Sequence, residues 1–256
     1  MKQIVGQGGK NILDFTDFTH SGHCAPIIEN EEPPLAESDL HQYIVYRSVV
    51  GSRAYGLDHL ESDTDRRGIY LPPADLHWSL AGVPEQITSD EDIFWEVKKF
   101  LEMILKANPS ALECLYTPIV EHASPIAQDL LDLRPRLLSK LVYDTFKGSA
   151  ESIFRKMRSE IVNKQQTNWK SFMHLLRLLQ AGTGLLRDGF LRVHVGEHRD
   201  RLLKISRGEE SFESCTTWME QLQQELGRAA ESTQLPDRPD VPTANDWLLR
   251  ARRSVI

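Results

Sequence analysis

From residue 43 the apolar residues occur in short continuous runs, a pattern that is typical of buried β-strands. The run YIVYRSVV at residues 43–50 is rich in β-branched and aromatic residues and stops at Gly51. This pattern predicts a buried strand that ends in a tight turn. A second apolar run at residues 68–71 closes at a Pro-Pro pair and predicts another strand. Residues 93–97 fit either a third strand or the start of a helix.

From Val97 onward the apolar spacing becomes helical, with apolar residues at positions 97, 100, 101, 104 and 105. Asn108–Pro109 ends this helix and begins another, since proline suits a first helical turn. Ser110 and Glu113 have the spacing of a capping box. We therefore interpret Glu113 as a helix cap in preference to a catalytic acid.

After about residue 120 the pattern predicts helices almost throughout. The clearest signal is an apolar stripe formed by Phe172, Leu175, Leu176 and Leu179. Three spaced prolines precede a last short helix, expected at residues 246–252. Residues 1–34 keep no apolar period and predict an irregular extension. The expected organisation is an extension (1–34), an α+β domain (35–120) and a helical domain (121–256).

Composition narrows the class of protein. The 256 residues are 40% hydrophobic and 26% charged, an ordinary globular profile with enough length for a sizeable core. A net charge of −7 argues against a generally basic nucleic-acid-binding surface but leaves room for a local basic groove. No stretch approaches the roughly 20 apolar residues of a membrane span, and no export signal stands at the N-terminus. We expect a cytoplasmic protein without a membrane partner.

The cysteines predict neither a disulfide framework nor a strong metal site. Cys24, Cys114 and Cys215 are odd in number and far apart. His20 and His23 lie close to Cys24, which raises the alternative of zinc. A structural zinc site usually needs four ligands at recognisable spacing, and no second cluster follows in the sequence.

Residues 49–65 carry the most informative chemistry. Gly51–Ser52 follows the first strand, and Asp63 and Asp65 come after ten intervening residues. Glycine at a strand end lets backbone N–H groups approach a phosphate, and a following hydroxyl adds a donor. Two aspartates spaced by two share one face of an extended segment, and Mg²⁺ prefers such oxygen ligands. An isolated Asp-x-Asp is often only a solvated turn, but its spacing from Gly–Ser makes the combination more specific.

This segment resembles the polymerase β-like nucleotidyltransferase superfamily, whose pattern is a hydrophobic residue, Gly, Gly or Ser, a spacer, and then Asp-x-Asp or Asp-x-Glu. Val50, Gly51, Ser52, Asp63 and Asp65 match it position by position. The stretches GSRAYGL, SDTDRRGIY, KKFLEMILKANPSALECLY and KSFMHLLRLLQAG are similar to predicted nucleotidyltransferases associated with RNA ligases in bacteria and phages. The resemblance implies a nucleotidyltransferase fold, a small mixed sheet with flanking helices, followed by a helical domain.

The resemblance also implies a third acidic residue on a neighbouring strand. Asp90, Glu91, Asp92 and Glu96 are the candidates. Asp92 heads the apolar run DIFWEV, at the place where the family has an acid before its lysine-rich helix. We select Asp92, with Glu96 second, because the two share one face if the run is a strand. The alternative for Asp92 is a helix N-cap.

A group of cationic and imidazole side chains marks the helical half. Lys170, His174 and Arg177 lie at i, i+4 and i+7, on a different face from the apolar stripe. Such a face is commonly just solvated. The stretch also resembles the family's KxxxHxxRL pattern, and arginine can bind phosphate with two hydrogen bonds. We therefore assign these residues to nucleotide binding. Arg53, beside Ser52, is a further candidate for a phosphate contact.

Together these features predict a magnesium-dependent nucleotidyltransferase (EC 2.7.7 type). Asp63, Asp65 and Asp92 would hold two Mg²⁺ ions, with Asp92 helping to activate an acceptor hydroxyl that attacks the α-phosphate and releases pyrophosphate. ATP is the expected nucleotide, and the resemblance to the RNA-ligase-associated family suggests an RNA end as the acceptor. The alternatives are an enzyme that transfers AMP to protein, or a non-catalytic nucleotide or RNA sensor. The predicted nucleotide contacts are Gly51, Ser52, Arg53, Lys170, His174 and Arg177.

Overall fold

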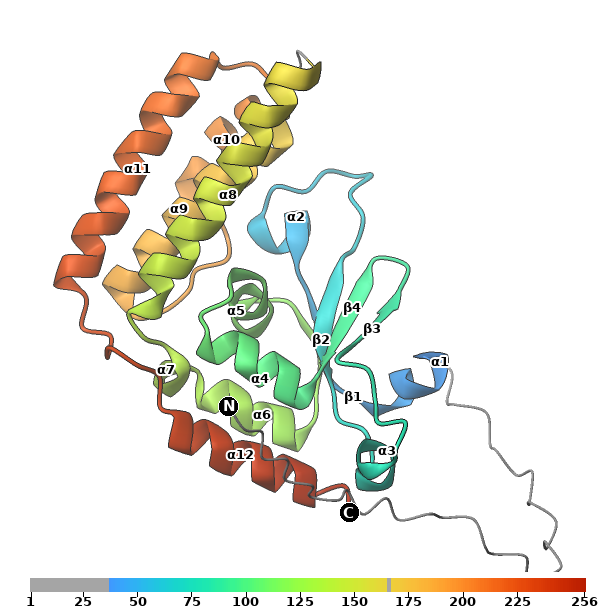
Figure 1. The fold of residues 1–256 in the computed structure, drawn as a ribbon. Coiled ribbons are helices and arrows are strands. Elements are labelled where there is room, and N and C mark those ends of the chain that lie inside the picture. The colour runs from blue at the N-terminus through green and yellow to red at the C-terminus, as the bar shows by residue number, and fades with distance from the viewer. Residues whose placement is uncertain (1–36, 165–166) are drawn as a thin grey trace, which may run out of the picture. The chain divides into compact units, whose positions relative to one another are not determined.

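A computed structural model describes residues 37–164 and 167–256, which fall within one compact unit comprising residues 34–256 (Figure 1). The expected irregular extension at residues 1–34, including His20, His23 and Cys24, lies outside the described residues. Within the described part of the chain, no helix has both the length and the apolar character needed to cross a membrane.

Five strands form one mixed sheet in the order β3-β4-β2-β1-β5. The central pair β2–β4 is parallel, while β1–β2, β1–β5 and β3–β4 are antiparallel. The first strand ends just before Gly51, as the apolar run predicted, and the undecided run near residue 93 is a strand. The strands are β1 (Ile44–Val49), β2 (Arg66–Tyr70), β3 (Gln86–Ser89), β4 (Asp92–Glu96) and β5 (Val120–Ala123).

Short helices flank the sheet, and longer ones follow it. Figure 1 shows α4, α5 and α6 on one face of the sheet. This arrangement confirms the predicted α+β class, a mixed sheet with flanking helices followed by a helical region. The helices around the sheet are α1 (Glu37–Leu40), η1 (His41–Tyr43), α2 (Gly51–Tyr55), α3 (Ala74–Trp78), α4 (Val97–Leu105), α5 (Pro109–Tyr116), α6 (Pro125–Asp132) and α7 (Arg134–Leu137). Those that follow are α8 (Leu141–Lys164), α9 (Trp169–Asp188), η2 (Gly196–His198), α10 (Arg199–Ser206), α11 (Phe212–Ser232) and α12 (Val241–Arg253).

The start of α5 corrects the predicted capping box. Pro109 occupies the first turn, so the N-cap is Asn108, whose side chain accepts a hydrogen bond from the N–H of Ala111 at 3.2 Å. Glu113 therefore lies more than a turn inside the helix and cannot reach the residue that caps it. The interpretation of Glu113 as a cap is wrong, and its carboxylate is free to make a long-range contact.

One hydrophobic core joins the sheet-flanking helices to the helices that follow. The predicted stripe of Phe172, Leu175, Leu176 and Leu179 is buried in it, as expected. Gly182 brings α9 close to α8, since a Cβ at this position would lie 2.8 Å from the ring of Phe146. This close packing places side chains of α8 and α9 beside one another and next to α5, where the pocket described below is found.

Candidate active site

The end of β1 meets the start of β2 at Gly51 and Asp65. The N–H of Val50 donates to the carbonyl oxygen of Asp65 at 2.9 Å. Gly51 has φ +71°, and a Cβ added to it would lie 2.2 Å from Oδ2 of Asp65. Glycine is therefore required twice here, once by the left-handed backbone and once by the carboxylate that approaches it. The structure brings together two residues that the sequence pattern paired across the intervening loop.

Gly51 opens the short helix α2 directly, in place of the bare turn expected after β1. N–H groups in the first turn of a helix have no acceptor within the helix, so those of Gly51 and Ser52 remain available for other partners. Both residues are half-buried. The predicted phosphate-binding pair therefore presents backbone donors next to the Asp65 carboxylate.

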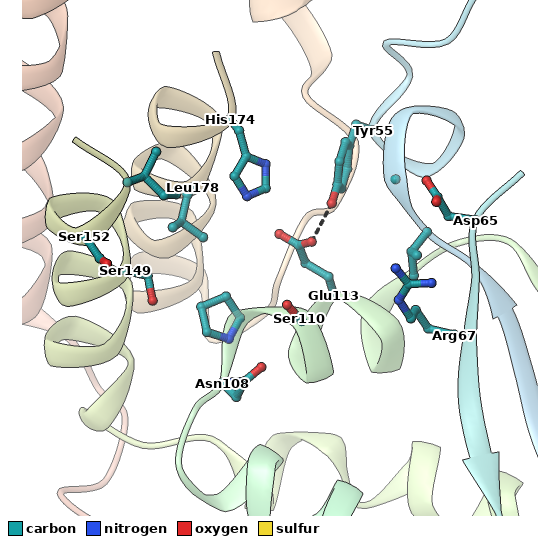
Figure 2. Close-up of a pocket in the computed structure, with 14 residues that line it drawn as sticks. Tyr55, Asp65, Arg67, Asn108, Ser110, Glu113, Ser149, Ser152, His174 and Leu178 are labelled. Atoms are coloured by element: carbon teal, nitrogen blue, oxygen red, sulfur yellow. Dashed lines mark hydrogen bonds between the residues drawn. The ribbon is translucent and has the colours of Figure 1, made fainter. Parts of the chain in front are cut away.

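A pocket of about 450 Å³ lies beside this junction. Figure 2 shows Tyr55, Asp65 and Arg67 on one side of it and side chains from α8 and α9 on the other. Of the predicted site residues, Gly51, Asp65 and His174 line it. Its remaining lining residues come from α2, β1–β2, α5, α8 and α9, namely Val50, Tyr55, Arg67, Asn108, Pro109, Ser110, Glu113, Ser149, Ser152, Ile153 and Leu178.

Arg67 is a pocket residue that the sequence reasoning missed. It follows Asp65 by two positions at the start of β2, so the two side chains share one face. Its Nη1 donates to the carbonyl oxygens of Glu91 at 2.6 Å and Arg66 at 2.9 Å. Asp63, Asp65 and Arg67 are spaced by two residues, so the alternation that linked the two aspartates could also have identified Arg67. A cation and a carboxylate thus stand together at the sheet side of the pocket.

A hydrogen-bonded network centred on the buried pair of Glu113 and Arg177 forms the wall between α2, α5 and α9. Nη1 of Arg177 donates to Oε1 of Glu113 at 2.7 Å, and the hydroxyl of Tyr55 donates to Oε2 at 2.6 Å. The guanidinium carbon of Arg177 lies 3.6 Å from the centre of the Tyr55 ring. Nη2 of Arg177 is 3.2 Å from Nδ1 of His174. We refer to these four residues, Tyr55, Glu113, His174 and Arg177, as the Arg177 network.

The protonation of this network follows from its contacts. Burial acts to lower the pKa of Arg177, but Glu113 and Tyr55 outweigh it, so the pKa is raised and the side chain stays charged. Burial raises the pKa of Tyr55, which stays protonated. His174 is exposed at the pocket but has protein atoms packed around its ring. Desolvation by those atoms and then Arg177 lower its pKa to about 4, with Glu113 opposing them. At neutral pH, His174 is therefore uncharged.

Arg177, which was predicted to bind nucleotide, does not line this pocket. Only 2% of its side chain is exposed, because it serves as the partner of the Glu113 carboxylate. Lys170, in the first turn of α9, is exposed and does not line the pocket. The three residues of the predicted helical face therefore lie in different surroundings. Lys170 is in solvent, His174 lines the pocket and Arg177 is in the interior.

Arg53 and Asp63 lie in or against the loop that leads to Asp65. Arg53 donates to the carbonyl oxygen of Ser62 at 2.7 Å and to that of Asp63 at 3.3 Å. Asp63 is exposed and precedes Asp65 by two residues. Neither residue lines the pocket. These contacts give Arg53 a structural role, holding the loop that carries the aspartate pair.

The two candidates for the third carboxylate lie at opposite ends of β4. Oδ1 of Asp92 accepts a hydrogen bond from the N–H of Arg66 at 3.2 Å, one residue from Asp65. Glu96 caps α4, accepting from the N–H of Lys98 at 2.9 Å, and pairs with Arg252 of α12. Asp92 is therefore the acid near Asp65, while the carboxylate of Glu96 is already committed to the fold.

The acidic side chains near the pocket fit a magnesium site that takes two carboxylates from the protein. Among residues 37–164 and 167–256, no three His, Cys, Asp or Glu side chains stand close enough to hold a metal ion, so Asp63, Asp65 and Asp92 do not form a ready-made triad. Mg²⁺ usually takes one or two carboxylates together with substrate phosphates and water. Asp65, placed against the backbone of Gly51, and the nearby Asp63 meet that requirement.

Comparison with known proteins identifies the family of the chain. Residues 28–250 match the RNA repair pathway DNA polymerase beta family. The "Uncharacterized protein YcgL" of Bacillus subtilis (strain 168) is 31% identical over 157 residues, which cover 57% of this chain and 57% of that protein. The chain thus spans little more than half the length of this curated relative.

The family match runs through the sheet and the helices alike, and together with the mixed sheet and its flanking helices it shows a polymerase β-like nucleotidyltransferase family. The resemblance drawn from the sequence is confirmed. The chain belongs to the RNA repair pathway DNA polymerase beta family, and this membership indicates a nucleotidyltransferase.

Proposed function

We propose that the protein is a magnesium-dependent nucleotidyltransferase that moves a nucleoside monophosphate from a nucleoside triphosphate to an acceptor hydroxyl. The observation that supports it most is the contact between Gly51 and Asp65 at the edge of a pocket. Backbone donors for phosphate and a carboxylate for a metal ion are adjacent there. Phosphoryl transfer needs both at one place.

The roles of the chain's own residues follow from their positions. The N–H groups of Gly51 and Ser52 bind the triphosphate, and Arg67 neutralises part of its charge. Asp63 and Asp65 would hold magnesium together with the substrate phosphates, and Asp92 would add the third carboxylate. When bound there, magnesium would supply positive charge that stabilises the reacting phosphate. The contribution of the protein is mainly positioning and charge neutralisation.

For the acceptor we propose the hydroxyl of an RNA end. The support is the description of the family as part of an RNA repair pathway. ATP is the nucleotide proposed. Transfer of AMP to a protein hydroxyl would use the same reacting groups, so it serves as an alternative outcome of the test.

The experiment uses ATP labelled at either the α- or the γ-phosphate, with magnesium and mixed RNA and protein acceptors. The proposal expects the α-label alone to become attached to RNA and to be released by ribonuclease. Incorporation of the γ-label would indicate phosphoryl transfer and contradict the proposed reaction. An α-labelled product that resists ribonuclease and yields to protease would replace RNA with protein as the acceptor. If none of the four nucleoside triphosphates gives a labelled product, the proposed enzymatic activity is refuted.

A further inference from the structure

The two ends of the pocket differ in charge. At the sheet end stand the carboxylate of Asp65 and the guanidinium of Arg67. The opposite end is lined by α5, α8 and α9, and Figure 2 shows the side chains of Ser149, Ser152 and His174 there. Glu113 is the acid on this side, and both of its oxygens already accept hydrogen bonds within the Arg177 network. The groups that remain available to a ligand at the α5–α8–α9 end are therefore uncharged.

Several of those neutral groups have hydrogen-bonding capacity to spare. The hydroxyls of Ser110, Ser149 and Ser152 make no hydrogen bond to another residue among those the structure describes. Asn108 uses its carbonyl oxygen to cap α5, which leaves its NH₂ group as a donor. Leu178, from α9, adds apolar surface beside them.

The tautomer of His174 follows from its neighbour. Arginine can only donate hydrogen bonds, so Nδ1 of His174, 3.2 Å from Nη2 of Arg177, must accept. Its lone pair is then occupied, and the one proton of the neutral ring sits on Nε2. Arg177 cannot turn away from this contact easily, because Glu113 and the ring of Tyr55 hold it. His174 thus presents an uncharged N–H donor of fixed orientation to the pocket.

We propose that the α5–α8–α9 end of the pocket binds the nucleoside part of the substrate, and that Nε2–H of His174 donates to an acceptor atom of that nucleoside. Arg177 is a positioning residue that acts through His174. This inference rests on the proposed nucleotidyltransferase function. A triphosphate needs cationic groups and a metal ion, and the sheet end offers Arg67 and a carboxylate that could hold a metal. A nucleoside is uncharged, carries donor and acceptor atoms, and has apolar faces.

The test compares the binding of ATP, GTP, CTP and UTP with that of inorganic tripolyphosphate, each with magnesium, to the full chain. His174→Asn removes the donor at the Nε2 position, while His174→Gln keeps an amide N–H close to it. We expect His174→Asn to weaken binding of the preferred nucleotide about three- to tenfold, the range for one neutral hydrogen bond. Tripolyphosphate binding should not change, and His174→Gln should restore most of the nucleotide affinity.

A second variant and a spectroscopic measurement make the test independent of how His174→Asn folds. The double change Ser149→Ala and Ser152→Ala should also weaken nucleotide but not tripolyphosphate. Nitrogen-15 NMR of labelled histidine, with the His174 signal assigned by its loss in His174→Gln, should show protonated Nε2 and unprotonated Nδ1 at pH 7. In Arg177→Met combined with Glu113→Gln, this single tautomer should give way to a mixture.

The outcomes separate this inference from the proposed function. Unchanged nucleotide affinity in His174→Asn, equal weakening of nucleotide and tripolyphosphate, or a proton on Nδ1 would each overturn the nucleoside subsite while leaving a triphosphate site in place. A wild-type chain that binds tripolyphosphate as tightly as every nucleotide would also overturn it. A wild-type chain that binds none of these ligands refutes the proposed function, and the subsite with it.

Discussion

Glu113 and Arg177 form a buried ion pair that joins α5 to α9 across 64 residues of sequence. Their side chains are 8% and 2% exposed. The second oxygen of Glu113 accepts a hydrogen bond from Tyr55, the last residue of α2, and α2 begins at Gly51. The pair therefore connects the helical region to the segment that binds phosphate in the proposed mechanism.

Removing one member of this pair should destabilise the protein strongly. Arg177→Met leaves the Glu113 carboxylate buried without its cation, and we expect a loss of about 3–5 kcal/mol in the free energy of unfolding. Arg177→Met combined with Glu113→Gln should lose less than Arg177→Met alone. Urea denaturation of the three proteins measures this. The exposed control Arg158→Met should stay within about 0.5 kcal/mol of wild type, and an equally small loss in Arg177→Met would contradict the pairing.

His174 should make stability depend on pH between its folded and unfolded pKa values. Its pKa is about 4 in the folded chain and 6.5 as the reference value, so in this window the unfolded state binds a proton that the folded state does not. The free energy of unfolding should fall as pH is lowered from 6.5 towards 4. The charged or titratable groups around the ring are Arg177 on the same helix, Glu113 on α5 and Tyr55 on α2.

Urea denaturation at pH 7 and pH 5 checks this dependence. Other groups also titrate between these pH values and lower the stability of both His174→Gln and wild type. The relevant quantity is therefore the difference between the stability losses of the two proteins. We expect wild type to lose more stability than His174→Gln on acidification. An identical loss in the two proteins would mean that His174 titrates normally.

Gly51→Ala should disturb both the fold and the site. Alanine at this position would have to adopt the left-handed backbone at φ +71°, and its Cβ would lie 2.2 Å from Oδ2 of Asp65. We expect a loss of about 1–3 kcal/mol and a displaced carboxylate with low transfer activity. The matched control is Gly227→Ala in α11, where a Cβ meets open space, and where a gain of up to about 1 kcal/mol is expected. Similar stabilities for the two variants in thermal denaturation would count against the strained junction.

The two ends of β4 should respond to substitution in different ways. Glu96→Gln weakens the cap of α4 and the pair with Arg252, so we expect a lower melting temperature with activity retained in the folded fraction. Asp92→Asn, near Asp65, should remove transfer activity with a smaller effect on melting. Melting curves and turnover of both variants decide this. An inactive Glu96→Gln beside an active Asp92→Asn would exchange their roles.

Local sequence patterns predicted the features that depend on local geometry. The apolar run before Gly51 predicted β1, and the stripe on α9 predicted its buried face. The Arg177 network was beyond such patterns, because helical spacing describes one face of one helix and does not show which distant carboxylate meets it. Glu113 was mistaken for a cap for the same reason, since a capping-box spacing is local and Asn108 competed for that role. Ser149 and Ser152 belong to the pocket only through the packing of α8 on α9.

The central claim, that the Gly51–Asp65 junction carries nucleotidyl transfer, is tested most directly by the turnover of Asp65→Asn with α-labelled nucleotide. The exposed Asp246→Asn of α12 provides a control for the loss of one carboxylate. We expect Asp65→Asn to fold and to lose at least about a hundredfold in turnover, the magnitude typical of removing a major electrostatic contact. Asp246→Asn should match wild type. Wild-type turnover in folded Asp65→Asn would contradict the assignment of the active site.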